Sequence, residues 1–466
     1  MNAISMLMTG KDGAPLFGTR KILMNFGLLV MCSQFAFAVL AMKGAFLPQL
    51  LELWQISKTQ FGLLMSIYGI CHNILYVGLS WAQDRFAPRA LISANLVLGG
   101  ITTFFVGQTS DFATLCFLFV MLALWCEGVF WPAVIASVRR STSDSNQGKI
   151  FGLLEGGRGC IELLQNALTV ALYSALSYSL LGLEVAFMVN GVILVILGLV
   201  SWFNLPSETL LKSRDDSGAA NREVKAGMLA TFRLPEVWLA GFTGFMVYVA
   251  YTTMPYFLTY LDDLFLLPAL AISIFGIAST SGGRISLALP AGFIADRFFG
   301  GPSGGMRFGL GLTAVLSLGM ALLPTDTGNY VPAMALMIAL AFTFFFMRAL
   351  YFAPFGEMGL PPRFSGSVIA VASFVIYLPA TFAYGLFGAL LDARPGAEGY
   401  ALMFGGLVAV GLLGMVIATL LKRRIDGGAA ERISEKIRAL DAQLGLRGEE
   451  RTMTGVASDS YESAPR

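Results

Sequence analysis

The chain has 466 residues, of which 56% are hydrophobic and 13% charged, and its mean hydropathy is +0.71. A soluble protein of this length would expose far more charge, so the composition indicates an integral membrane protein. The formal net charge of +2 is too small to indicate a nucleic-acid partner.

Apolar runs long enough to cross a hydrocarbon core of about 30 Å as helices recur about twelve times along the chain. We expect them at 24–50, 61–82, 90–109, 112–137, 150–177, 183–204, 236–261, 268–294, 307–324, 331–354, 366–391 and 399–421. The sequence therefore predicts an all-α membrane protein with 12 transmembrane helices in two six-helix bundles, 24–205 and 236–421. The remaining segments are an N-terminus (1–23), a polar linker (206–235) and a tail (422–466).

Lysine and arginine collect in alternate loops, such as those that hold Arg139, Arg307 and Arg423. The opposite loops hold little positive charge beyond Lys58 and Arg394. Because loops rich in lysine and arginine stay in the cytoplasm, both termini are predicted to be cytoplasmic. No secretory signal peptide is evident, and we expect a multi-pass protein of the bacterial inner membrane.

A short motif recurs at the same place in each predicted bundle. The loop after the second run reads SWAQDRFAPRA, and the loop after the eighth reads GFIADRFFGGP. The Asp84–Arg85 and Asp296–Arg297 pairs therefore occupy equivalent positions, which indicates an internal duplication.

These loops resemble the signature of the major facilitator superfamily, Gly-x-x-x-Asp-Arg/Lys-x-Gly-Arg/Lys-Arg/Lys. Gly292, Asp296 and Arg297 match its first part, whereas Ser80 and Ala87 replace glycines of the first copy. The resemblance covers about residues 24–421 and implies transport by alternating access. It also implies that both Asp-Arg pairs form a cytoplasmic gate between the bundles.

A narrower resemblance concerns GVFWPAV at 128–134 and the glycine that enters the fifth span. Both are similar to the organic-anion branches of that superfamily, the organophosphate/phosphate exchangers and the anion:cation symporters. The resemblance places Lys43 near the exchangers' first-helix basic residues and Arg158 close to their fifth-helix substrate contact. Ala250 stands where the exchangers place an arginine, so this chain departs from their phosphate clamp.

Several ionisable residues fall inside the apolar runs, where such residues almost always face a bundle interior or a cavity. We expect substrate contacts from four cations and two aromatic residues, namely Lys43, Arg158, Arg284, Arg348, Tyr251 and Trp131. We expect proton coupling from Glu127, Glu155, Glu162 and His72. Arginine suits this role because its guanidinium grips carboxylate, phosphate or sulfonate groups through two hydrogen bonds.

Structural alternatives exist for these residues. Glu155, Arg158 and Glu162 lie on one helix face at i, i+3 and i, i+4 spacing, and they can neutralise one another. Lys43 and Arg348 can extend toward the membrane surface instead of a cavity. Likewise, Glu127 can form an interhelical pair, and His72 can serve in packing.

The sequence thus predicts a secondary active transporter of a small organic anion, coupled to protons by symport. Anion exchange, with a counter-anion in place of the proton, is the first alternative, and proton-driven export of lipophilic or cationic compounds is the second. A non-transporting membrane sensor is the alternative from another class. No catalytic constellation, cofactor motif or metal site is evident, and we expect a monomer in the lipid bilayer.

Overall fold

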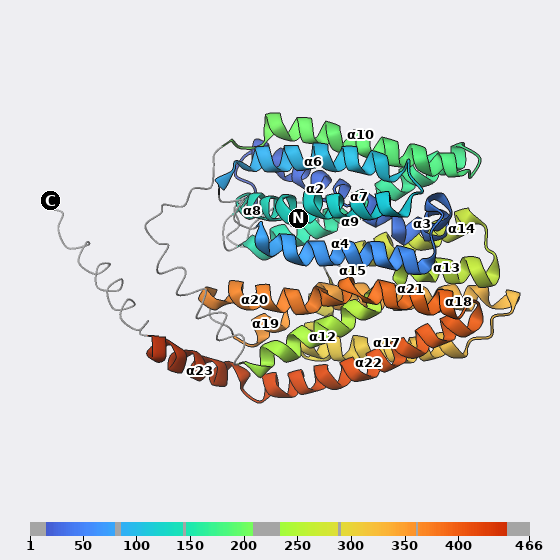
Figure 1. Ribbon diagram of the computed structural model, residues 1–466. Coiled ribbons are helices and arrows are strands. Elements are labelled where there is room, and N and C mark those ends of the chain that lie inside the picture. The colour runs from blue at the N-terminus through green and yellow to red at the C-terminus, as the bar shows by residue number, and fades with distance from the viewer. Residues whose placement is uncertain are drawn as a thin grey trace.

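The computed structural model describes residues 15–79, 85–142, 146–207, 234–287, 290–359 and 362–444. The regular elements within these ranges are helices. Figure 1 shows the helices of the first half of the chain lying together above those of the second half, with most axes running in a similar direction. The chain is therefore all-α in its described parts, as predicted.

The first half begins with α2, a helix that breaks after Phe35 and continues at an angle of 45° as α3. Ser57 and Gln60 form a capping box that starts α4, and the Asp111 carboxylate accepts a hydrogen bond from the Thr114 amide at the start of α7. The elements are α2 (Arg20–Phe35), α3 (Ala38–Trp54), α4 (Lys58–Gly78), α6 (Pro88–Val106), α7 (Phe112–Ala123), the π-helical turn η1 (Leu124–Phe130), α8 (Trp131–Arg139), α9 (Gln147–Ala175) and α10 (Leu180–Asn204).

The second half begins at α12 with Pro235, which suits a first helical position because its missing amide hydrogen needs no partner there. Its elements are α12 (Pro235–Tyr251), α13 (Met254–Phe265), α14 (Ala269–Ile277), the π-helical turn η4 (Ala278–Gly282), α15 (Gly283–Leu287), α16 (Pro290–Phe299), α17 (Pro302–Leu322), η5 (Thr327–Asn329), α18 (Tyr330–Leu350), α19 (Pro354–Glu357), α20 (Pro362–Tyr377), η6 (Leu378–Thr381), α21 (Ala383–Ala393), α22 (Ala397–Asp426) and α23 (Ala429–Leu444).

Within the described ranges, nine helical spans are long and apolar enough to cross a membrane, and the bent pair α2–α3 makes a possible tenth. Helices α4 and α9 are not among them, although Figure 1 shows both lying alongside the others. In α9 the charged Glu155, Arg158 and Glu162 and the amides Gln165 and Asn166 lower the mean hydropathy. Polar residues of this kind inside a helical bundle usually face its interior.

The two halves pack closely at the end of the molecule opposite α23, which is the right end in Figure 1. Helix α4 packs on α21 there, and α3 packs on α13 and α14. The approach brings backbone against backbone, since a Cβ atom on Gly62 would lie 2.5 Å from the Tyr384 carbonyl oxygen. A Cβ atom on Gly276 would lie equally near the Gly44 carbonyl oxygen, at 2.5 Å. Side chains at these positions would keep the halves apart.

Candidate substrate and proton site

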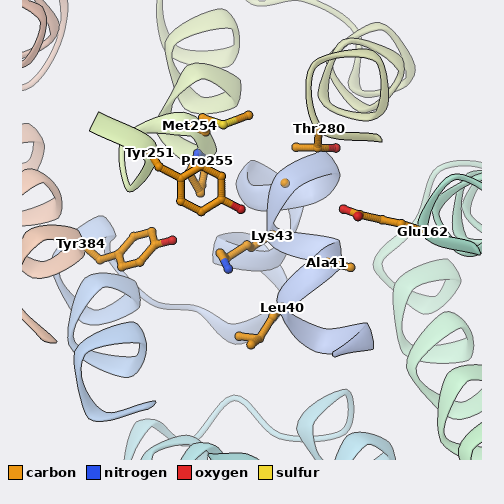
Figure 2. Close-up of a pocket in the computed structure, with 10 residues that line it drawn as sticks. Leu40, Ala41, Lys43, Glu162, Tyr251, Met254, Pro255, Thr280 and Tyr384 are labelled. Atoms are coloured by element: carbon orange, nitrogen blue, oxygen red, sulfur yellow. The ribbon is translucent and has the colours of Figure 1, made fainter. Parts of the chain in front are cut away.

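A cavity lies between the two halves and is lined by both. The residues that line it are Leu40, Ala41, Lys43 and Gly44 of α3, Glu162 of α9, and Tyr251, Met254, Pro255, Thr280 and Tyr384 of the second half. Figure 2 shows Lys43 extending between Leu40 and the rings of Tyr251 and Tyr384. The volume of the cavity, measured for the centres of water molecules, is about 30 Å³, which is enough for about two waters. A larger ligand therefore requires the surrounding side chains to move.

Two cations from opposite halves lie at this cavity. Lys43 lines it, and Arg348 contacts the lining residue Tyr251. The Lys43 ammonium lies 5.6 Å from the centre of the Tyr384 ring, and the Arg348 guanidinium lies 4.1 Å from the centre of the Tyr251 ring. Arg348 also lies 5.9 Å from the ring centre of Phe345 on its own helix. Neither cation has a carboxylate partner among the residues that the structure describes. Lys43 lines the cavity together with Tyr251, and Arg348 lies on the Tyr251 ring, so two predicted substrate contacts lie around this tyrosine.

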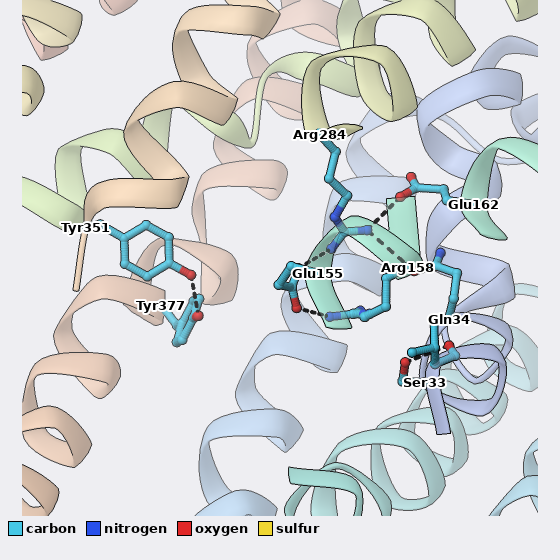
Figure 3. A network of polar contacts seen from close by, with 9 residues as sticks. Ser33, Gln34, Glu155, Arg158, Glu162, Arg284, Tyr351 and Tyr377 are labelled. Carbon is cyan, nitrogen blue, oxygen red and sulfur yellow. Dashed lines mark hydrogen bonds and ion pairs between the residues drawn. The ribbon is translucent and has the colours of Figure 1, made fainter. Parts of the chain in front are cut away.

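The other two cations are held by carboxylates, as Figure 3 shows. Arg158 donates to the Glu155 Oε1 atom at 2.8 Å, within α9. Arg284 donates to the Glu162 Oε2 atom at 2.6 Å and to the Glu155 Oε2 atom at 3.3 Å. Arg284 also lies 3.4 Å from the Gln34 Oε1 atom of α2. Because Arg284 belongs to α15, this network ties the second half to the first.

Arg158 packs against aromatic rings as well as against its carboxylate. Its guanidinium lies 4.7 Å from the ring centre of Trp131 and 5.4 Å from that of Phe37. Trp131, a predicted substrate contact, therefore lies on Arg158 in this arrangement. The glycines beside Arg158 admit neighbouring helices: a Cβ atom on Gly157 would lie 2.8 Å from a methyl of Val30, and one on Gly159 would lie within 3.5 Å of the Arg284 side chain.

Glu127 lies in the π-helical turn η1 and receives its partners from α4. Its Oε1 atom accepts a hydrogen bond from the Tyr68 hydroxyl at 3.1 Å, and its Oε2 atom lies 3.2 Å from His72 Nδ1. Glu127 therefore forms an interhelical pair between η1 and α4. A π-helical turn inside an α-helix frequently marks a functional position.

Four tyrosines of the second half, Tyr248, Tyr251, Tyr351 and Tyr377, form a continuous row of contacting side chains that we call the tyrosine wall. The hydroxyls of Tyr351 and Tyr377 are 2.6 Å apart. The Tyr377 ring centre lies 5.2 Å from that of Tyr248, and the Tyr248 ring centre lies 5.6 Å from that of Tyr251. From the first half, the His72 ring centre lies 6.0 Å from that of Tyr377. The tyrosine wall therefore connects His72, which can be protonated, with Tyr251, on whose ring the Arg348 guanidinium lies.

Of the predicted cytoplasmic gate, Asp84 lies outside the described residues, and Arg85, Asp296 and Arg297 are exposed. Sequence reasoning missed a set of contacts at the opposite end. Lys58 Nζ lies 2.7 Å from Asp263 Oδ2, and the Thr59 amide and hydroxyl donate to Asp392 Oδ2 at 2.7 and 2.6 Å. Each contact joins α4 to the second half. The only sequence signal for them was the presence of charged residues in the loops at that end.

The described residues contain no group of three or more histidine, cysteine, aspartate or glutamate side chains that could hold a metal ion. What they do contain is a buried set of charges and a cavity between two packed helical halves of an apolar chain. This arrangement is typical of membrane transporters that alternate access around a central site.

The comparison with known families makes the assignment specific. The model of the Major Facilitator Superfamily matches residues 26–384, so the chain belongs to that superfamily. It is therefore a transporter and not an enzyme, and it is a multi-pass protein of the inner membrane.

Several known proteins resemble the chain. It is 24% identical over 408 residues to the inner membrane protein YihN of Escherichia coli, covering 88% of this chain and 97% of that protein. It is 25% identical over 141 residues to the glycerol-3-phosphate transporter of Haemophilus influenzae, which covers 29% of each chain. The crystal structure of the nucleoside transporter NupG superposes with a TM-score of 0.63 at 13% identity, covering 86% of this chain and 99% of that one. The likeness to NupG shows a shared fold. The glycerol-3-phosphate transporter is consistent with the expected resemblance to organic-anion branches.

Proposed function

We propose that the protein is a secondary active transporter of a small organic anion, a carboxylate, phosphate ester or sulfonate. The observation that carries the proposal is that Lys43 and Arg348, from opposite halves, both border Tyr251 without a carboxylate partner among the described residues. We also propose twelve membrane spans, with α4 and α9 completing the set, in two bundles within 24–205 and 236–421, and both termini in the cytoplasm.

The energetics of a buried charge support an anionic ligand. A cation removed from water loses several kcal/mol of hydration, and an opposite charge recovers much of that loss. Lys43 and Arg348 are each partly buried. An anion between them would neutralise both and would bring the two halves together through shared contacts. Binding energy would then favour closure around the substrate, as alternating access requires.

Arg158 and Arg284 are expected to contact the substrate only after Lys43 and Arg348 have bound it. Each already donates to a glutamate, so an anion reaches either guanidinium only by displacing Glu155 or Glu162. We therefore assign the first contact to Lys43 and Arg348. Ala250 is fully buried where the organophosphate exchangers carry an arginine, and this assignment gives the chain an anion site that needs no cation there.

The test is uptake by vesicles that contain the purified full chain. The probes are glycerol 3-phosphate, lactate and ethanesulfonate, with tetraphenylphosphonium as a lipophilic cation. We expect saturable uptake of at least one anion, lost in Lys43→Gln and in Arg348→Gln. The matched control is Arg394→Gln, which removes an exposed arginine at the opposite end of the second half. Transport of tetraphenylphosphonium alone would support the exporter alternative, and no transport of any probe by vesicles with folded protein would contradict the proposal.

A further inference from the structure

Glu127, Glu155 and Glu162 lie inside the predicted spans, and they differ in what surrounds them. We propose that the Glu127–His72 pair, and not Glu155 or Glu162 of α9, carries the proton that couples transport. This inference rests on the proposed function and specifies its coupling site. Below, we call Glu127 and His72 the dyad.

The glutamates of α9 are unsuited to exchange a proton in this arrangement. Glu155 accepts from both Arg158 and Arg284, and Glu162 accepts from Arg284 at 2.6 Å. Arginine stays protonated in proteins, and its charge favours the ionised form of a carboxylate beside it. Either glutamate must therefore lose a strong charge-assisted hydrogen bond before it can be protonated. Both act as fixed counter-ions to Arg158 and Arg284.

The surroundings of Glu127 are different. Its carboxylate is in hydrogen-bond or ion-pair contact with Tyr68 and His72 of α4, and no described arginine lies within ion-pair distance of it. Among the other charged or titratable groups that act on it are Arg158 of α9 and Lys43 of α3, both at longer range, and its neighbour Cys126; Tyr248 of α12 faces the same region. Histidine changes charge near neutral pH, so the dyad can gain or lose a proton without breaking an arginine pair.

The position of the dyad between the halves supplies the link to access. Glu127, Tyr68 and His72 belong to the first half, whereas Tyr377 of α20, whose ring faces His72, belongs to the second. Movement of one half against the other changes whether Tyr377 shields His72 from water. The proton then reaches the dyad from one side of the membrane in one state and from the other side in the other state.

The tyrosine wall supplies the link to the anion. Contacts run from His72 through Tyr377 and Tyr248 to Tyr251, on whose ring the Arg348 guanidinium lies. An added proton makes the region between the halves more positive and favours an anion at Lys43 and Arg348. By linkage, a bound anion favours the protonated dyad to the same extent. Proton and anion therefore bind cooperatively, as symport requires.

The first test needs no substrate, because His72 is the single histidine of the chain. Full-length protein labelled with ¹³C,¹⁵N-histidine in nanodiscs gives one imidazole signal, whose pH titration reports on the dyad. Glu127→Gln preserves side-chain shape and is expected to shift the titration midpoint, because the imidazolium loses its carboxylate. Glu398→Gln, the same substitution at an exposed position, is the matched control. Equal midpoints in wild type and Glu127→Gln, with both proteins folded, would overturn the proposal.

The second test separates coupling from transport in the vesicles described above. For an anion that wild type accumulates against its gradient when the lumen is made alkaline, Glu127→Gln is expected to retain detectable exchange of labelled for unlabelled anion. It is expected to lose pH-driven accumulation, whereas Glu398→Gln keeps both. Accumulation by Glu127→Gln at the wild-type level would overturn the assignment of the proton. If wild type moves none of the anions, the proposed function fails, and the histidine titration still decides whether the dyad acts as a unit.

Discussion

Arg284 of α15 donates to the Glu162 carboxylate of α9 at 2.6 Å, across 122 residues of sequence and from one half of the molecule to the other. Replacing it by glutamine, Arg284→Gln, leaves Glu162 without its cation and weakens the hold on Glu155. Breaking one side of a buried pair costs about 3–5 kcal/mol, so the variant is expected to unfold at clearly lower temperature.

The corresponding control is the double variant Arg284→Gln/Glu162→Gln, which removes both charges. We expect it to recover part of the loss of melting temperature, because no unpaired carboxylate then remains at Glu162. Thermal unfolding of the purified proteins measures both effects. A double variant that is no more stable than Arg284→Gln would show that the pair contributes little.

Asp392 of α21 accepts hydrogen bonds from the backbone amide and hydroxyl of Thr59, in the first turn of α4. A carboxylate at a helix N-terminus is favourable because it interacts with unpaired amides and with the helix dipole. We call the end opposite α23, where the two halves pack closely, the closed end. Asp392→Asn is therefore expected to weaken the association of the halves at the closed end by about 1.5–3 kcal/mol, the usual contribution of hydrogen bonds to a charged group.

The measurement is the distance between spin labels on Gln108 and Leu266, two exposed positions near that end in opposite halves, in a background without native cysteines. We expect the distance distribution of Asp392→Asn to move toward longer values. Asp326→Asn, in a loop of the second half, serves as the control. An unchanged distribution in Asp392→Asn would mean that other contacts hold the end closed.

Arg348 lies on the face of Tyr251, which makes shape as important as charge at this position. Arg348→Lys keeps the charge but loses the planar stacking and the forked donors of the guanidinium. Cation–π contacts contribute about 0.5–2 kcal/mol, so we expect an anion affinity lower by about 2- to 30-fold in this variant.

Initial-rate uptake over a range of anion concentrations measures the effect as a rise in KM. Arg348→Gln is expected to lose saturable uptake altogether because the charge itself is gone. If Arg348→Lys and Arg348→Gln were equally impaired in KM, charge would not be the property on which binding depends.

The local parts of the site could be predicted from the sequence, and the distant parts could not. The Arg158–Glu155 pair follows from i, i+3 spacing on a helix, and the structure contains it. The partner of Arg284 lies 122 residues away, and the carboxylate beside His72 lies in another helix, so no spacing rule indicates either. A single histidine in a helix is ordinarily a packing residue, and only its proximity to Glu127 distinguishes this one.

The same limit applies to the fold. Hydropathy identified an all-helical membrane protein, because burial in lipid demands long apolar helices with internally satisfied backbones. Hydropathy indicates a membrane span less clearly for α9, because its polar residues lower the mean hydropathy and are accommodated by contacts with α2 and α15. The tyrosine wall was not distinguishable among the 14 tyrosines of the chain, since each has packing as its default role. Their alignment from His72 to Arg348 depends on the packing of three helices, α12, α18 and α20, with the first half.

Gly62 of α4 offers a test of the closed end that does not depend on charge. A Cβ atom there would lie 2.5 Å from the Tyr384 carbonyl oxygen and 2.6 Å from the Gly385 Cα atom, both backbone atoms of the opposite half. Because a backbone cannot rotate away as a side chain can, Gly62→Ala is expected to push α4 and α21 apart. Overpacking of this kind costs about 1–3 kcal/mol. The spin-label distance should lengthen as in Asp392→Asn.

Gly156→Ala is the matched control, since nothing beyond its chain neighbours and the nearby backbone of its own helix lies within 4 Å of the added Cβ position. Alanine also favours a helix by about 1 kcal/mol over glycine. It should leave the spin-label distance unchanged and keep or raise the melting temperature. A wild-type distance in Gly62→Ala, with the protein folded, would mean that α4 and α21 do not need this close approach. The closed end would then be held by the Asp392 and Asp263 contacts and by the packing of α3 on α13 and α14.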